Sequence, residues 1–261
     1  MNVAYDAYNR EERALCAHLF RLLHEGLATR PAEGPLARVL GRLAERDLQW
    51  RGAGLPLPRP LPIGRTIFTE VALIRDAYQD RKRSGALSAF MDELVAIVKR
   101  QQRAEDCPLW SELPRELSDP AKVHPRQILL RAQADGFDLG RDFARVYGAV
   151  QGLFNAKPDL VVTTPEHLLV FEAKLTQAFE RDQLERTAHL AELWSSPLLR
   201  GDLGFEREPS WSVIQLGDAR ANPELSWQEL AGFAVETWPA NDRSRIAFEA
   251  AVRLLAPRSR R

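Results

Sequence analysis

The sequence lacks the features that mark several large protein classes. Cysteine occurs only twice in 261 residues, at Cys16 and Cys107, which are too far apart for a CxxC pair or a zinc-binding spacing. We therefore expect buried thiols and no disulfide framework, as is usual in the cytoplasm. No apolar run approaches the length of a membrane span, and Met1–Arg13 is too polar and charged for a signal peptide. The expectation is a cytoplasmic protein without a membrane partner.

Several common enzyme motifs are missing too. The five histidines show no HExxH or similar spacing, and the chain contains neither a GxxxxGK[ST] loop nor a GxSxG elbow. The sequence therefore gives no support to a P-loop NTPase or a serine hydrolase. No internal repeat is visible.

The chain has no net charge, with 36 Lys and Arg against 36 Asp and Glu. Any affinity for nucleic acid must then come from a local patch of charge, because the molecule has no global field to attract it. Lysine itself is scarce, since nearly all the positive charge is arginine. The five lysines are Lys82, Lys99, Lys122, Lys157 and Lys174.

A chain of this length can bury a substantial core and holds one large domain or two small ones. Residues 1–130 are expected to form a mainly helical N-terminal region, interrupted at residues 51–64 by a connector dense in proline and glycine. Residues 131–261 are expected to hold a mixed β-sheet flanked by helices, followed by a C-terminal helix and a basic tail. The predicted fold class is therefore α/β, in the α+β sense.

The spacing of apolar residues predicts the individual elements. Helices are expected at residues 9–25, 35–49, 66–83, 86–103, 125–134, 178–195 and 226–234, and again from residue 247. Residues 142–154 are ambiguous, and we favour a strand through Val146–Val150. A further strand is expected at Trp211–Leu216.

The most informative stretch is Ala156–Leu175. Two short apolar runs, Leu160–Val162 and Leu168–Phe171, flank a polar segment that contains a proline, a pattern typical of a β-hairpin. Residues two apart on a strand share a face, so Glu172 and Lys174 point the same way. The opposite face is expected to enter a core with Leu169, Phe171, Ala173 and Leu175.

Charged residues at the end of this hairpin have a chemical use. A carboxylate and an ammonium on a buried strand are costly unless they are paired or bound to a metal. Mg²⁺ prefers oxygen ligands and usually takes one or two protein carboxylates, which Asp159 and Glu172 can supply, with the carbonyl of Ala173 as a further ligand. Lys174 can orient the attacking water and offset charge on a phosphate. In a chain where arginine is the default, this lysine favours a role for a compact, titratable ammonium.

These residues resemble a known pattern. Pro158-Asp159, followed after a strand-length gap by Glu172-Ala173-Lys174, resembles the PD-(D/E)xK nuclease superfamily, which has the restriction-endonuclease-like fold, over roughly residues 140–217. The resemblance implies an αβββαβ core and hydrolysis of phosphodiester bonds that depends on Mg²⁺ or Mn²⁺. It also implies that Asp159, Glu172 and Lys174 hold the metal and the water. The alternative is an ordinary hairpin with a Pro-Asp turn and a surface Glu–Lys pair.

Members of this superfamily often add an acidic residue from a preceding helix and sometimes a glutamine from the following one. Gln183 matches the glutamine, although a hydrogen bond within the core would also explain it. Glu70 and Glu12 compete for the acidic position, because each lies on or beside the apolar face of a predicted helix. We favour Glu70, since Glu12 also falls three residues after Asn9, at the position of a capping box.

The predicted function is that of a metal-dependent nuclease that acts on DNA, in restriction, phage defence or repair. The helical N-terminal half would select the substrate, form a homodimer or bind a partner protein. The first alternative is a non-catalytic nucleic-acid-binding or assembly protein with the same fold. The second is an α-helical interaction protein, which requires helix in place of strands across residues 143–174.

Overall fold

The computed structural model describes residues 11–29, 34–59, 66–69, 71–117, 124–175 and 178–255. The chain divides into two compact units. The sheet unit consists of Met1–Val71, Pro158–Ser195 and Arg207–Arg261, and the helical unit consists of Ala72–Lys157 and Ser196–Glu206. This division does not coincide with the expected boundary at residue 130, because most of the helical unit is inserted between two segments that build one sheet.

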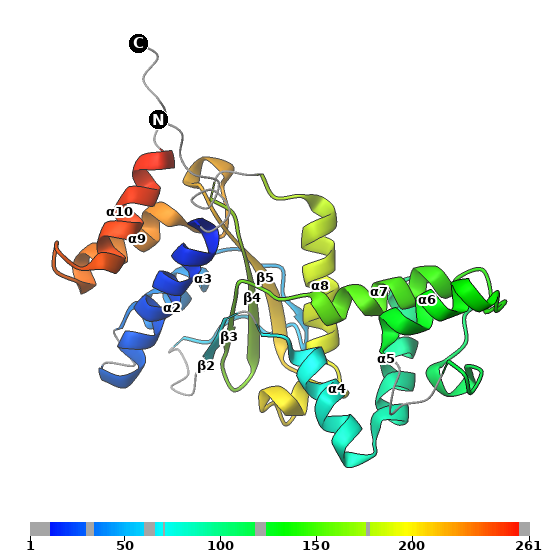
Figure 1. Ribbon diagram of the computed structural model, residues 1–261. Helices are drawn as coiled ribbons and strands as arrows, with labels where there is room; N and C mark the ends of the chain where they lie inside the picture. Colours follow the sequence, from blue (N-terminus) through cyan, green and yellow to red (C-terminus); the bar gives the residue numbers. More distant parts are fainter. Residues whose placement is uncertain are drawn as a thin grey trace, which may run out of the picture. The chain divides into compact units, whose positions relative to one another are not determined.

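A mixed sheet forms the centre of the sheet unit (Figure 1). Its strands are β1 (Arg51–Gly52), β2 (Thr66–Phe68), β3 (Leu160–Thr163), β4 (His167–Ala173), β5 (Ser210–Gly217) and β6 (Leu225–Ser226). The strand order is β1-β5-β4-β3-β2, with β6 also paired to β5. Strands β2, β3 and β4 pair antiparallel, whereas β4 and β5 are parallel. The expected α/β class with a mixed sheet is confirmed.

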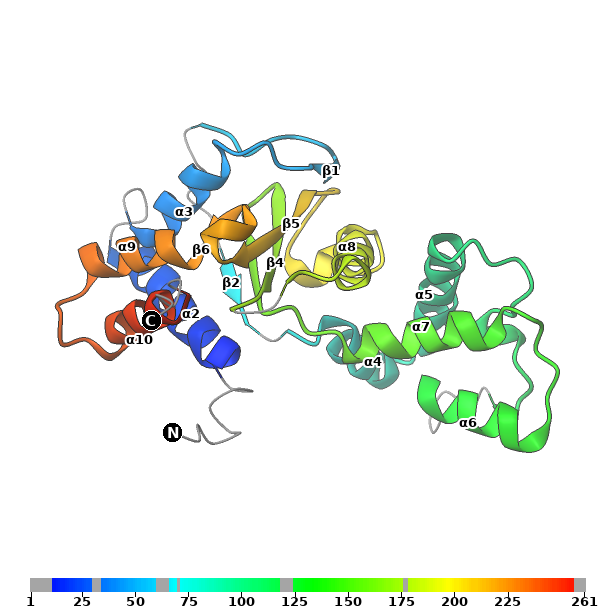
Figure 2. The ribbon, with the colours of Figure 1, turned by 90° about the horizontal axis from the view of Figure 1, so that it is seen from above.

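Helices cover both faces of this sheet. Helices α2 (Glu11–Thr29), α3 (Pro35–Leu43), α9 (Trp227–Thr237) and α10 (Arg243–Leu255) lie on one face, and α8 (Arg181–Ser195) lies on the other (Figures 1 and 2). Helix α8 connects β4 to β5, the kind of crossover that parallel strands require. Because both faces are covered, every residue of β4 is buried.

The residues of β4 alternate between these two faces. Leu169, Phe171 and Ala173 join the hydrophobic core formed with α2, α3, α9 and α10, and Leu175 follows them. Glu172 belongs to the alternate set and bonds to α8. The predicted hairpin and its apolar face are therefore confirmed, and an all-helical interpretation of residues 160–173 is wrong.

The start of α9 is fixed by a capping box. The hydroxyl of Ser226 accepts a hydrogen bond from the Glu229 backbone N–H at 3.2 Å, and Glu229 Oε2 accepts one from the Ser226 backbone N–H at 2.9 Å. Arg42 Nε of α3 donates to Glu229 Oε1 at 2.8 Å. Burial raises the pKa of Glu229, but the bonds from Arg42 and Ser226 outweigh it and hold the pKa below its ordinary value. This cap places Trp227, the first residue of α9, against the end of β4.

The helical unit contains α4 (Leu73–Ser84), α5 (Leu87–Gln101), α6 (Pro125–Asp135) and α7 (Phe143–Asn155), together with two short 3₁₀ helices, Trp110–Glu112 and Arg200–Leu203 (Figure 2). An aromatic cluster joins three of its segments, since the ring of Phe154 lies 5.3 Å from Tyr78 and 5.0 Å from His124 between centroids. Within the described residues, no helix is long and apolar enough to cross a membrane.

Two predicted elements differ from the structure in kind, and the helix expected at residues 35–49 ends already at Leu43. The strand at Val146–Val150 is wrong, because these residues lie in α7. Phe143, Val146, Val150 and Phe154 are all buried at helical spacing, a pattern that a five-residue window cannot separate from a strand. The single helix at residues 66–83 is also wrong at its start. Residues Thr66–Phe68 form β2, which pairs with β3, and α4 begins only at Leu73.

Candidate active site

The hairpin brings two carboxylates together at one end of β3 and β4. Leu160 lies opposite Phe171 in the antiparallel register, so Asp159, one residue earlier, lies opposite Glu172. Directly opposed residues of antiparallel strands share a face. Asp159 Oδ2 accepts a hydrogen bond of 2.8 Å from the backbone N–H of Ala173, which ties the start of β3 to the end of β4. The register therefore places both carboxylates on the face that α8 covers.

Glu172 is buried, with 8% of its surface exposed, and it is held by three side chains. Gln183 Nε2 donates a hydrogen bond to Glu172 Oε1. Thr187 Oγ1 lies 3.1 Å from Glu172 Oε2 and can donate to it. Lys174 Nζ lies 3.7 Å from Glu172 Oε1. A buried carboxylate is costly without such partners, and here each oxygen has at least one.

Lys174 is fixed through its backbone. Its N–H donates to the carbonyl of Leu216 on β5 at 2.8 Å, and its carbonyl accepts a hydrogen bond of 2.9 Å from the indole N–H of Trp227. Its side chain is only 14% exposed, and its ammonium lies beside the buried carboxylate of Glu172. Contacts from two neighbouring elements thus hold the lysine on the same face as Glu172.

The oxygen atoms at this site suit a hard divalent cation. Asp159 and Glu172 are carboxylates on adjacent strands, and Ala173 lies between them with its N–H on Asp159. Among the described residues, no group of three or more Asp, Glu, His or Cys side chains is placed to hold a metal. Two carboxylates are nonetheless the number that Mg²⁺ commonly takes from a protein, with water and phosphate oxygens completing its shell. The donor set therefore fits the ion that the sequence predicts.

The structure brings together Asp159, Glu172, Ala173, Lys174 and Gln183, all of which the sequence singled out. Glu70 lies outside the described residues. The sequence favours Glu70 because a helix across residues 66–83 would place it beside an apolar face. That helix begins only at Leu73. Glu12 lies within α2, but its side chain is outside the described part of the structure. The choice between these two acids stays a prediction.

Thr187 is the residue that the sequence analysis missed. It lies four positions after Gln183, so both side chains are on the same face of α8. Its hydroxyl reaches both Glu172 and the carbonyl of Gln183, each at 3.1 Å. The sequence does carry one signal for it. Thr187 is spaced three, four and seven residues before Leu190, Ala191 and Trp194, so a threonine lies on a helical face that continues with apolar residues, all of them buried in the structure.

Comparisons of this chain with models of protein families, with curated protein sequences and with solved structures give no significant match.

Proposed function

We propose that this protein is a metal-dependent nuclease that hydrolyses phosphodiester bonds in DNA. The observation that carries the proposal is the placement of Asp159, Glu172 and Lys174 on one face of the hairpin, with Gln183 holding Glu172. Two oxygen ligands beside one ammonium match the needs of phosphoryl chemistry, in which a cation and a general base or water-positioning group act on the same phosphate.

The order of elements supports a restriction-endonuclease-like core. Helix α2 is followed by the antiparallel strands β2, β3 and β4, then by α8 and by β5, which is parallel to β4. This order is compatible with the αβββαβ core that the resemblance implies, but α2 and β2 lie outside residues 140–217, with α3 and β1 between them and the helical unit inserted between β2 and β3. The insertion explains why β2, which pairs with β3, lies far from the hairpin in sequence.

Hydrolysis adds water across one phosphorus–oxygen bond, with the hydroxyl going to phosphorus and the proton to the leaving oxygen. Asp159 and Glu172 would hold Mg²⁺ or Mn²⁺, which lowers the pKa of bound water and neutralises developing charge when it is bound. Lys174 would orient the water and donate a hydrogen bond to a phosphate oxygen. Gln183 and Thr187 would keep the Glu172 carboxylate turned toward the cation. A cytoplasmic role in restriction, phage defence or repair is part of the same proposal.

Cleavage assays test the proposal directly. Supercoiled plasmid and labelled single-stranded DNA and RNA are incubated with Mg²⁺, Mn²⁺ or a chelator, with the wild type beside Lys174→Ala. Lys157→Ala is the matched control, because Lys157 is an exposed lysine that precedes the same hairpin in the sequence. We expect metal-dependent cutting that Lys174→Ala abolishes and Lys157→Ala retains. The proposal fails if the wild type cuts none of the substrates and Lys174→Ala behaves identically.

One observation favours a second candidate, a non-catalytic nucleic-acid-binding or assembly protein. Glu172 already has hydrogen-bond or ionic partners for both oxygens, so its burial is compensated within the protein. Titration calorimetry with Mn²⁺ separates the two. A nuclease should bind Mn²⁺ with saturable heat that Asp159→Asn removes, whereas a scaffold should show no saturable heat.

A further inference from the structure

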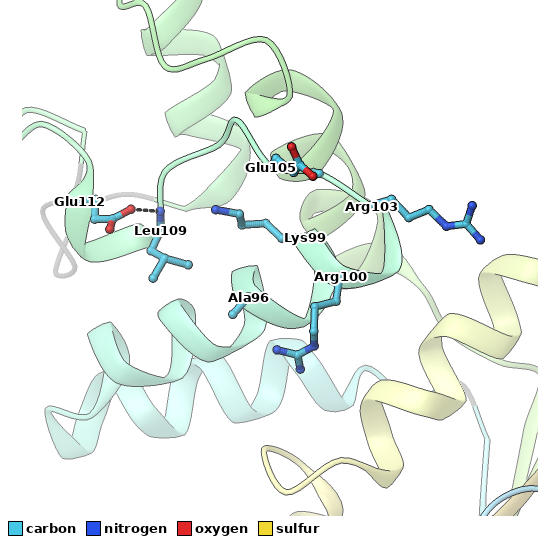
Figure 3. A pocket seen from close by; sticks show the side chains of 8 residues that line it. Ala96, Lys99, Arg100, Arg103, Glu105, Leu109 and Glu112 are labelled. Atoms are coloured by element: carbon cyan, nitrogen blue, oxygen red, sulfur yellow. Dashed lines mark hydrogen bonds between the residues drawn. The ribbon is translucent and has the colours of Figure 1, made fainter.

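The helical unit has a basic hollow at the C-terminal end of α5. We define it by its lining residues Ala96, Lys99, Arg100, Arg103, Ala104, Glu105, Leu109 and Glu112, which enclose a volume of about 480 Å³. Every one of these residues belongs to the helical unit. Figure 3 shows Lys99 reaching across toward Leu109, while Arg100 and Arg103 extend away from the helix in different directions.

The conformation of Arg103 sets this hollow apart from the other helix ends. Arg103 has a φ of +50° and follows the C-cap residue Gln102, and the next N–H, from Ala104, bonds to the carbonyl of Lys99. This six-to-one bond is the Schellman motif, in which the left-handed position is usually glycine. Helices α4 and α6 end in the same way, but with Gly85 and Gly136 at that position.

Of the two non-glycine residues with positive φ in the described chain, the other is Asn222, and asparagine tolerates this conformation well. An arginine does not, so the chain accepts a conformational cost to place a guanidinium here.

The usual explanation for cations at a helix C-terminus is that they offset its partial negative charge. This accounts for Lys99 and Arg100 but not for an arginine in place of glycine. The carbonyl of Gln102 already accepts a hydrogen bond from Arg145, which lies outside the hollow. Lys99 bonds to the backbone carbonyl of Cys107 rather than to a carboxylate.

The two acids of the hollow do not neutralise its cations. Glu112 Oε2 accepts a hydrogen bond of 2.7 Å from the backbone N–H of Leu109. Neither Arg100 nor Arg103 forms an ion pair with any residue that the structure describes. The hollow therefore carries three cations against two carboxylates, one of which caps a 3₁₀ helix, and its two guanidinium groups are exposed.

We propose that the basic hollow binds the sugar–phosphate backbone of a nucleic acid. The directions of the side chains favour this occupant, because guanidiniums that spread apart are placed for successive phosphates of an extended chain and not for one small anion. The inference rests on the proposed function for its choice of polymer and assigns substrate binding to the helical unit.

The test uses the full-length protein, labelled single- and double-stranded DNA, and fluorescence anisotropy in a chelator, so that no cutting occurs. Arg103→Gly is the informative variant, because glycine suits the left-handed position. We expect its thermal stability to be unchanged or raised while its affinity falls by about three- to tenfold and the slope of log K against log salt decreases by about one. Arg103→Lys should retain most of the affinity. Arg83→Gln, which removes an exposed arginine of α4 with 78% of its side chain accessible, should bind like the wild type.

Equal affinity and salt slope in Arg103→Gly and wild type would overturn the inference, as would an equal loss in Arg83→Gln. Competition with inorganic phosphate gives a second way to overturn the inference. If low millimolar phosphate displaces DNA with the same concentration dependence in all variants except Arg103→Gly, the hollow is a site for a single anion and not for a nucleic-acid backbone. Lys174→Ala separates the two proposals: in the chelator, where only the hollow should hold DNA, it should bind like the wild type, and with Mg²⁺ or Mn²⁺ it should not cut. If neither the wild type nor any variant cuts DNA in the cleavage assay with Mg²⁺ or Mn²⁺, but Arg103→Gly binds weakly in the chelator, the basic hollow stands and the nuclease proposal fails.

Discussion

Asp159 has two roles in the proposed site, and one substitution can separate them. Its Oδ2 atom accepts the Ala173 N–H at 2.8 Å, and the same carboxylate is a proposed metal ligand. Asp159→Asn keeps an oxygen that can accept this hydrogen bond but removes the negative charge. Asp159→Ala removes both. A hydrogen bond to a charged group contributes about 1.5–3 kcal/mol to stability and a neutral one about 1 kcal/mol. We therefore expect Asp159→Asn to cost about 1 kcal/mol and Asp159→Ala about 2–3 kcal/mol.

The effect on activity should be much larger than the effect on stability. Cation stabilisation of the transition state is worth several kcal/mol, and each 1.4 kcal/mol is a factor of ten, so Asp159→Asn should slow cleavage by a factor on the order of 10²–10³. Urea unfolding without metal measures the loss of stability. Plasmid cleavage measures the loss of activity, and calorimetry with Mn²⁺ measures the loss of metal binding. The reasoning is refuted if Asp159→Asn is as unstable as Asp159→Ala, or if it binds Mn²⁺ like the wild type.

Three further predictions, one with its own control substitution, test the surroundings of the site. Thr187→Val keeps the shape but leaves the buried carboxylate one donor short, so urea unfolding should show a loss of about 1–2 kcal/mol; an unchanged midpoint would contradict this. Trp227→Phe removes the indole donor to the Lys174 carbonyl and should lower the cleavage rate at saturating substrate. Trp194→Phe, a buried tryptophan whose Nε1 has no hydrogen-bond partner in the described residues, should leave the rate unchanged, and equal rates in both would show that only packing matters. Because the pKa of Glu229 is lowered in the folded state, its stabilisation is complete above its ordinary pKa and is lost as the pH falls through the folded value. Glu229→Gln should therefore destabilise the protein at pH 7 more than at pH 3, and an equal loss at both would contradict the linkage.

The hairpin was predictable because its signals are local. Strands of four and seven residues flank a turn with Pro165, and the alternation of Phe171 and Glu172 alone assigns them to opposite faces. The chemistry-bearing residues fall within this same short window. The apolar runs, the turn and the alternation of side chains therefore all indicate the same hairpin, without reference to the rest of the chain.

Strand β2, which extends the hairpin to three antiparallel strands, was not predictable in this way. Thr66–Phe68 is three residues long, and its pairing with β3 joins segments more than ninety residues apart. Such a short segment becomes a strand through its neighbours in the sheet rather than through its own propensity. The helix α7 shows the converse error, since Val146–Val150 fits a strand until Phe143 and Phe154 extend the spacing to three turns. The division into two compact units also differs from the expected boundary at residue 130, because the helical unit is inserted between β2 and β3, a pairing that the sequence does not show.

Gln183 and Thr187 mark the limit for the site itself. Both belong to α8, whose exposed face is rich in charge, and only the packing of α8 on β4 turns them toward Glu172. A polar residue on a buried helical face identifies such positions, but it does not identify the partner. The sequence therefore predicts which strand carries the carboxylate more readily than which helix holds it in place.

The balance of charge links this packing to the proposed reaction. Among the described residues, Asp159, Glu172 and Lys174 leave one net negative charge at the end of the hairpin. A divalent cation would convert this to one positive charge, which a single phosphodiester would cancel. Charges brought into a partly buried site are costly unless they are paired. Binding of the cation would offset the negative charge of the carboxylates, and binding of the phosphodiester would offset the positive charge that the cation leaves. The protein alone is then slightly repulsive to DNA at the site and attractive only with the cation bound. DNA bound at the hairpin should for this reason require Mg²⁺ or Mn²⁺, whereas DNA bound at the basic hollow should not.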